Sequence, residues 1–139
     1  MAAIPVPLYC ASKAAISSFT RSMAALEQIN GIRVVCLAPG NVRTPIWSSY
    51  GVDREGWLEE GKDEWVPVER IVDGMIKLIP KRGEGGDYES GTVLEVTLDG
   101  NREVKALNDP GPTGKGSTVS NVDALMGELM GELGTNFGK

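Results

Sequence analysis

Apolar residues recur at helical spacing near the start of the chain. From Ile16 on they recur every three or four positions, with no proline or glycine between them: Ala15, Ile16, Phe19, Met23 and Leu26. This pattern predicts one helix from about Tyr9 to Ile29. Asn30 and Gly31 follow the last apolar position and predict the end of the helix, because both residues tolerate the left-handed conformation of a helix C-cap.

A second pattern, rich in β-branched residues, comes directly after this helix. Ile32 to Ala38 suits a largely buried strand, and Pro39-Gly40 closes it with a turn signal. Val68 to Ile79 then repeats the helical spacing and ends at Pro80. Its apolar residues are expected to make one face of a helix: Ile71, Val72, Met75, Ile76 and Ile79.

The C-terminal part of the chain changes in composition. Asp109 to Asn121 is rich in Gly, Pro, Ser and Thr, which is typical of a flexible connection. Helical spacing then returns over residues 122–133: Val122, Leu125, Met126, Leu129, Met130 and Leu133. Gly127 and Gly131 interrupt it, at a cost of about 1 kcal/mol each relative to alanine. We expect a marginal helix that packs as an arm and carries no site.

Tyr9 and Lys13 are the first candidates for chemistry. Four residues advance an α-helix by just over one turn, so the two side chains project from the same face. A lysine ammonium beside a phenol stabilises the phenolate, and the tyrosine can then exchange a proton with a carbonyl or hydroxyl oxygen. The same spacing also arises by chance on amphipathic helices whose polar side chains face water.

Together with the segments after it, this pair resembles the short-chain dehydrogenase/reductase family. The resemblance comprises Tyr9-Cys-Ala-Ser-Lys13, the helix, the strand that follows, Pro39-Gly40, and Val42-x-Thr44-Pro45. It is firm from about Ile4 to Ile46 and looser from there to about Asp99. It implies an α/β fold that corresponds to the C-terminal portion of a Rossmann-type doubly wound parallel sheet. Ser90 to Gly100 resembles the last strand of that family.

The resemblance also implies roles for particular residues. Tyr9 would be the catalytic acid–base, and Lys13 would assist it and bind the nicotinamide ribose. Pro39, Gly40, Val42 and Thr44 would line the nicotinamide end of NAD or NADP. Alternative interpretations are an ordinary strand-ending turn at Pro39-Gly40 and a helix cap or turn hydroxyl at Thr44.

Several family elements would lie upstream of Tyr9. They are a Gly-rich phosphate-binding turn, an asparagine on a middle helix and a catalytic serine, whereas the eight residues before Tyr9 contain no serine. We therefore expect a truncated copy that neither binds cofactor tightly nor turns over alcohols alone. Finding the turn and the serine encoded in frame upstream of Met1 would favour an incomplete sequence.

Residues Ile46 to Trp65 correspond to the segment that covers substrate in the family. Its aromatic residues Trp47, Tyr50 and Trp57, with Trp65, lie among acidic residues. They could close over an apolar substrate as a lid. Equally, they could anchor a loop to the core while the acidic side chains stay solvated.

Composition narrows the choice of functions. The chain has 139 residues and a formal net charge of −5, which argues against a nucleic-acid partner. It has no histidine and only two cysteines, so we expect neither a zinc site nor a histidine-based triad, and reduced thiols at Cys10 and Cys36. No apolar run approaches the length of a membrane span, so we expect a cytoplasmic protein.

Two functional hypotheses follow. The first is an NAD(P)-dependent oxidoreductase that transfers hydride between nicotinamide and a secondary alcohol or ketone. The second is a non-catalytic remnant that acts, if at all, as a dimerising module. In both, residues 1–100 are the C-terminal half of the family's domain, and 101–139 are a flexible extension with a marginal helix. We also expect a homo-oligomer formed through the Tyr9–Ile29 helix, because this helix packs against its copy in the family.

Overall fold

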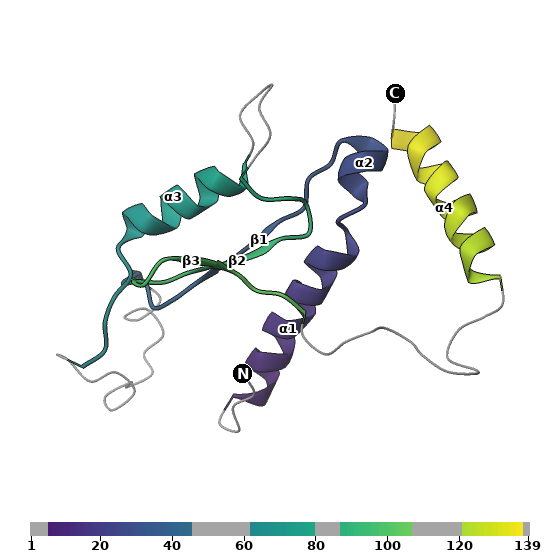
Figure 1. Ribbon diagram of the computed structural model, residues 1–139. Helices are drawn as coiled ribbons and strands as arrows, with labels where there is room; N and C mark the ends of the chain where they lie inside the picture. The colour runs from purple at the N-terminus through teal and green to yellow at the C-terminus, as the bar shows by residue number, and fades with distance from the viewer. Residues whose placement is uncertain (1–5, 46–61, 80–86, 107–120, 138–139) are drawn as a thin grey trace.

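The computed structural model describes residues 6–45, 62–79, 87–106 and 121–137 (Figure 1). Seven elements follow one another along these segments: α1 (Pro7–Ser22), α2 (Leu26–Asn30), β1 (Cys36–Pro39), α3 (Val68–Leu78), β2 (Val93–Val96), β3 (Asn101–Glu103) and α4 (Val122–Phe137). They form a mixed α/β arrangement that corresponds to part of a Rossmann-type fold, so the predicted fold class is confirmed.

The sheet has the order β1-β2-β3 in the described residues. β1 and β2 are parallel, with Leu37 opposite Leu94, whereas β2 and β3 form an antiparallel hairpin with Val96 opposite Asn101. Gly100 supplies a φ of 137° in the hairpin turn, a conformation that favours glycine. The expected last strand, Ser90 to Gly100, is therefore shorter than predicted. In the sheet, β2 lies between β1 and β3. The sequence did not predict β3, because its polar residues show no alternating apolar pattern.

The core lies between the sheet and α3. Leu94 and Val96 of β2 are completely buried, and they pack with Ile71 and Leu78 of α3. Gly74 lets the helix approach closely, because a Cβ at this position would come within 2.8 Å of a methyl group of Val96. The β-branched and leucine side chains of β2 thus form the floor on which α3 rests.

The predicted apolar face of α3 is only partly buried. Of the five residues expected there, Ile71 alone is buried, while Val72, Met75, Ile76 and Ile79 are 46–66% exposed. The helix instead buries Ile71, Gly74 and Leu78. The close approach at Gly74 turns the helix so that the side containing Gly74 faces the sheet. A pattern of apolar residues does not reveal this orientation, because glycine adds little to such a pattern.

The predicted single helix over residues 9–29 is also wrong. α1 ends at Ser22, and a turn over residues 23–25 leads into α2. In this turn the amide of Ala24 donates to the carbonyl of Arg21, and Ala24 packs against Gly91 just before β2. The break between α1 and α2 therefore coincides with a tertiary contact. The sequence gives no local signal for this break, since it has no proline or glycine there. The predicted end is confirmed, since Gly31 is a left-handed C-cap with a φ of 68°.

The predicted strand over residues 32–38 is shorter than expected and displaced by one residue at its end. β1 covers Cys36–Pro39, and Ile32 is 45% exposed. Residues 32–35 before β1 belong to no helix or strand, and other contacts hold them, since the Val34 carbonyl accepts from the Gly91 amide at 2.7 Å. Of the predicted strand, only residues 36–38 therefore pair in the sheet.

α1 lies on the side of the sheet opposite α3 (Figure 1). Near its C-terminal end, Thr20 is buried and Arg21 donates to the carbonyl of Val104, just after β3, at 2.7 Å. The large apolar side chains of Leu8, Ile16 and Phe19 are 84%, 48% and 60% exposed. Small and polar residues therefore attach α1 to the sheet, and its bulky apolar residues remain accessible.

α4 extends four residues beyond the predicted helix. Its C-terminal end meets α2, where the side-chain amide of Asn30 donates to the carbonyl of Leu133 at 2.8 Å and Ile29 lies beside Gly134. Toward its N-terminal end α4 points away from the sheet (Figure 1). The helix thus does dock, by one end, on the helix pair that begins the chain.

Candidate functional site

The pair Tyr9 and Lys13 lies on the first two turns of α1. The Lys13 ammonium lies 5.3 Å from the centroid of the Tyr9 ring, a cation–π contact. Tyr9 is 61% exposed, so its hydroxyl is open to a small molecule. The predicted proximity of the two side chains is present in the structure, with the ammonium over the ring face.

Local hydrogen bonds hold this part of α1. Pro7 begins the helix, a position where its missing N–H is not needed, and the Cys10 amide donates to the Val6 carbonyl at 3.0 Å. Ser12 and Ser17 donate their hydroxyls to the carbonyls of Tyr9 and Lys13, at 2.7 and 3.1 Å. The backbone that carries the pair is therefore regular helix from its first turn.

Pro39 and Gly40 lie at the end of β1. The Gly40 amide donates to the carbonyl of Val96 at 2.9 Å, and a Cβ on Gly40 would lie 3.1 Å from a methyl group of Val66. A Cβ at position 40 would therefore be tight, and the Val66 side chain would have to shift slightly to accept it. The strand-ending turn thus packs against Val66 and β2.

Val42 and Thr44 differ in their surroundings. Val42 is partly buried and packs against the core cluster, whereas Thr44 is exposed. α1 and β1 run in roughly opposite directions, so the N-terminal turns of α1 and the segment after β1 lie toward the same end of the molecule (Figure 1). Tyr9 and Lys13 form one cluster, and the residues after β1 form a second.

A contact that sequence reasoning missed joins the two ends of the predicted lid segment. The Arg43 guanidinium lies 5.0 Å from the centroid of the Trp65 ring, and the Val66 amide donates to the Asn41 carbonyl at 2.8 Å. Residues 41–43 and 65–66 therefore lie side by side. An arginine and a tryptophan more than twenty positions apart give no periodic signal.

The lid residues Trp47, Tyr50 and Trp57 lie outside the described residues. Within the described segments, no group of three or more His, Cys, Asp or Glu side chains could hold a metal ion. Cys10 and Cys36 are both free and half-buried. None of the helices that the structure describes has the length and apolar character needed to cross a bilayer.

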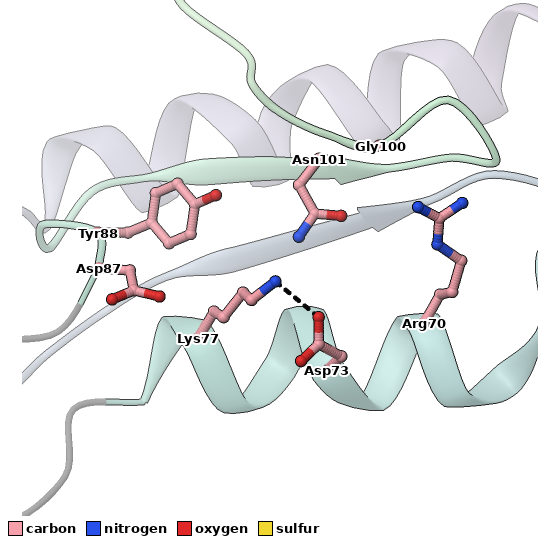
Figure 2. A pocket seen from close by; sticks show the side chains of 7 residues that line it. All are labelled: Arg70, Asp73, Lys77, Asp87, Tyr88, Gly100 and Asn101. Atoms are coloured by element: carbon pink, nitrogen blue, oxygen red, sulfur yellow. Dashed lines mark ion pairs between the residues drawn. The ribbon is translucent and has the colours of Figure 1, made fainter.

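A polar groove of about 370 Å³ lies between α3 and the β2–β3 hairpin (Figure 2). Its lining is Arg70, Asp73, Lys77, Asp87, Tyr88, Gly100 and Asn101. On α3, Arg70, Asp73 and Lys77 recur at i, i+3 and i+7, a polar spacing that could have indicated this face from the sequence.

The charges of this groove largely satisfy one another. Lys77 forms an ion pair with Asp73 at 2.7 Å (Figure 2), and the hydrogen bond and charge of Asp73 raise the pKa of Lys77 above its ordinary value of 10.5. The Arg70 guanidinium donates to the carbonyl of Leu98 in the hairpin. The lining contains two basic and two acidic side chains, so it carries no net charge that would select a charged ligand. The hydrogen bond of Arg70 joins α3 to the hairpin.

Comparison with known families matches residues 1–55 to the short chain dehydrogenase family. The matched segment contains both clusters described above, from Tyr9 and Lys13 to Pro39, Gly40 and Thr44. α3, the β2–β3 hairpin and α4 lie outside it.

Curated relatives match over part of the chain. The L-fucose dehydrogenases of Oryctolagus cuniculus and Bos taurus are each 44% identical over 56 residues, or 38% of this chain and 20% and 21% of their own lengths. The Mus musculus enzyme of the same name is 44% identical over 39 residues, 28% of this chain and 14% of its own. The alignments thus span about one fifth or less of these relatives. No solved structure matches the chain.

Proposed function

Because residues 1–55 match the short chain dehydrogenase family, we propose that the chain carries part of the catalytic site of an NAD(P)-dependent oxidoreductase. The substrate class is a secondary alcohol or the corresponding ketone. The observation that carries this proposal is the Tyr9–Lys13 pair, an exposed phenol with an ammonium 5.3 Å from its ring centroid.

Tyr9 has the role of proton carrier in this proposal. When an alcohol is oxidised, its hydroxyl proton passes to the phenolate oxygen of Tyr9, and when a ketone is reduced, the phenol returns a proton to the carbonyl oxygen. The Lys13 ammonium lies beside this phenol, 5.3 Å from the centroid of its ring. The exposure of Tyr9 supports this role, because the substrate oxygen must come within hydrogen-bond distance of the hydroxyl.

The residues present suit the nicotinamide half of the cofactor chemically. Lys13 and Thr44 are exposed donors suited to a ribose hydroxyl and a carboxamide, and Pro39, Gly40 and Val42 would line the nicotinamide beside Thr44. When bound, the nicotinamide supplies or accepts the hydride. The pyrophosphate half is different, since α1 and α3 begin after Val6 and Pro67 and neither follows a glycine-rich turn. We therefore assign only the nicotinamide end to these residues.

Self-association through the helix over residues 9–29 is the second part of the proposal. The exposed side chains Leu8, Ile16 and Phe19 on α1 support it, because they face away from the sheet. The same observation favours a non-catalytic dimerising module as the second candidate function. The two candidates differ in whether Tyr9 matters for turnover.

A fusion protein tests the catalytic role. The chain is placed behind the N-terminal portion of the rabbit L-fucose dehydrogenase that precedes the matching segment, and nicotinamide absorbance is followed with L-fucose and with simple secondary alcohols. We expect turnover by the fusion, and a loss of about 10²–10⁴-fold in kcat for Tyr9→Phe. Tyr88→Phe, in the polar groove, is the matched control and should retain activity.

Two results would contradict the proposal. Full activity of the Tyr9→Phe fusion would remove Tyr9 as the proton carrier, and a fusion that folds and dimerises but never turns over would favour the non-catalytic candidate. The chain by itself should show no tight cofactor binding in calorimetry. Micromolar binding would show that residues outside the assigned set hold the pyrophosphate.

A further inference from the structure

Arg43 lies between two residues that the proposed function assigns to the nicotinamide, Val42 and Thr44, and its side chain has a partner elsewhere. The Arg43 guanidinium lies 5.0 Å from the centroid of the Trp65 ring, within the range of a cation–π contact. Trp65 is partly buried, whereas Arg43 and Thr44 are exposed. Three consecutive residues thus have different surroundings: the core for Val42, an aromatic ring for Arg43 and the surface for Thr44.

Backbone hydrogen bonds anchor the start of the loop over residues 40–44, here called the 40–44 loop. The Gly40 amide donates to the Val96 carbonyl at 2.9 Å, and the Val66 amide donates to the Asn41 carbonyl at 2.8 Å. Val66 is only 5% exposed, so the second hydrogen bond attaches the loop to a buried residue. The loop itself belongs to no helix or strand. The order of Thr44 therefore depends on contacts made after Asn41, because no regular backbone pairing continues to it.

The contact between Arg43 and Trp65 supplies such an anchor one residue before Thr44. Trp65 directly precedes Val66 in the chain, so the ring belongs to the segment that already holds the start of the loop. One backbone contact and one side-chain contact thus join the 40–44 loop to this segment. A group that is ordered before its ligand arrives avoids the entropy cost of being ordered on binding, and this improves affinity.

We propose that Arg43 is a positioning residue for the nicotinamide end of the cofactor and that it acts through Trp65 without touching the cofactor. The guanidinium holds the 40–44 loop against the Trp65 ring, and Thr44 is thereby ordered before the nicotinamide binds. This deepens the proposed function and rests on its assignment of Thr44 to the nicotinamide. Direct contact of Arg43 with the ligand is the alternative role for this arginine, and the test separates the two roles.

The test measures the binding of dihydronicotinamide riboside to the full chain by NMR, from the amide shifts of Gly40, Val42 and Thr44. This probe contains the nicotinamide and its ribose but has no phosphate and no net charge, so ion pairing with Arg43 does not contribute. The chain should bind it weakly but measurably. Arg43→Ala should weaken binding about two- to fivefold, the loss expected for an exposed cation–π contact. Arg43→Lys keeps a cation over the ring and should recover most of this loss.

Two further variants serve as controls. Arg102→Ala also removes an exposed arginine, together with its ion pair to Glu95, on a strand that β2 separates from β1, and it should bind like the wild type. Thr44→Val removes the hydroxyl at nearly constant volume and should weaken binding, which tests the assignment on which the proposal rests. NMR relaxation should show greater motion of the Thr44 amide in Arg43→Ala than in Arg43→Lys, while circular dichroism confirms that both variants fold.

A Trp65→Leu background decides how Arg43 acts. If Arg43 acts through the ring, adding Arg43→Ala to Trp65→Leu should cause no further loss of affinity. A further loss would show a role independent of the ring, such as direct contact with the ligand, and would overturn the proposal. Unchanged binding by Arg43→Ala, with weakened binding by Thr44→Val, would also overturn it and leave the proposed function standing. A wild type that does not bind the probe, or a Thr44→Val chain that binds it fully, would overturn the nicotinamide assignment and this proposal together.

Discussion

Gly91 lies where the sheet meets the turn between α1 and α2, and its replacement by alanine should destabilise the fold strongly. Its φ is +87°, a region that L-residues rarely adopt. A Cβ at this position would lie 2.7 Å from the Cβ of Ala24 and 3.7 Å from the Cα of Arg21. The neighbouring atoms belong to backbone or to a one-carbon side chain, so they cannot rotate away.

Two separable costs set the magnitude. A left-handed backbone costs a residue with a Cβ about 1–2 kcal/mol, and overpacking costs about 1–3 kcal/mol more. We therefore expect Gly91→Ala to lower the free energy of unfolding by about 2–5 kcal/mol. Gly31→Ala isolates the first cost, because Gly31 also has a positive φ, +68°, yet has no neighbouring atom within 4 Å of a built Cβ. It should cost only about 1–2 kcal/mol.

Urea unfolding followed by circular dichroism, at one fixed protein concentration, measures these differences. Ala24→Gly removes the atom that a new Cβ at position 91 would meet. Combined with Gly91→Ala, it should recover much of the overpacking cost, although alone it costs up to about 1 kcal/mol. The two substitutions must therefore be non-additive. Strict additivity, or equal costs for Gly91→Ala and Gly31→Ala, would refute the described contact.

Two further predictions concern charged side chains. Arg43→Ala should cost about 0.5–1 kcal/mol of unfolding free energy through the lost contact with Trp65, while Arg43→Lys retains most of it; equal losses in both variants would exclude a cation–π contribution. Asp73→Asn should lower the pKa of Lys77 toward 10.5, measured by NMR titration, whereas Glu69→Gln should not. Because the pKa is raised in the fold, the pair stabilises the protein below the unfolded-state value and this contribution is lost as pH rises through the folded value. An unchanged Lys77 titration in Asp73→Asn would show that the ion pair is absent in solution.

Sequence patterns located most of the elements and misjudged how they pack. The helix end at Gly31 was predictable because an asparagine and a glycine encode a C-cap locally. The break after Ser22 was not predictable, since it coincides with contacts between Ala24 and Gly91, two residues far apart in the chain. Likewise, Gly74 sets the buried face of α3 through its fit to Val96, which a count of hydrophobic residues does not register.

The candidate site shows the same division. Tyr9 and Lys13 were predictable as neighbours because helical periodicity alone brings them together. The contact between Arg43 and Trp65 depends on two chain segments returning to the same place, and no local pattern encodes it. One side of the polar groove could have been predicted from the sequence, since three of its residues follow helical spacing. The other side comes from a hairpin that the sequence did not predict.

Pro39 also limits how the sheet can grow. In the described residues β1 has β2 on one side only, and the amides of Cys36 and Gly40 donate toward that neighbour. By alternation the intervening position 38 points the same way, and positions 37 and 39 point outward. Proline has no N–H, so Leu37 is left as the sole outward amide donor of this strand. A strand added at this border could accept one backbone hydrogen bond from β1, at Leu37, and could donate to the outward carbonyls of Leu37 and Pro39, so Pro39 removes one of the donors that an edge strand offers to a further strand.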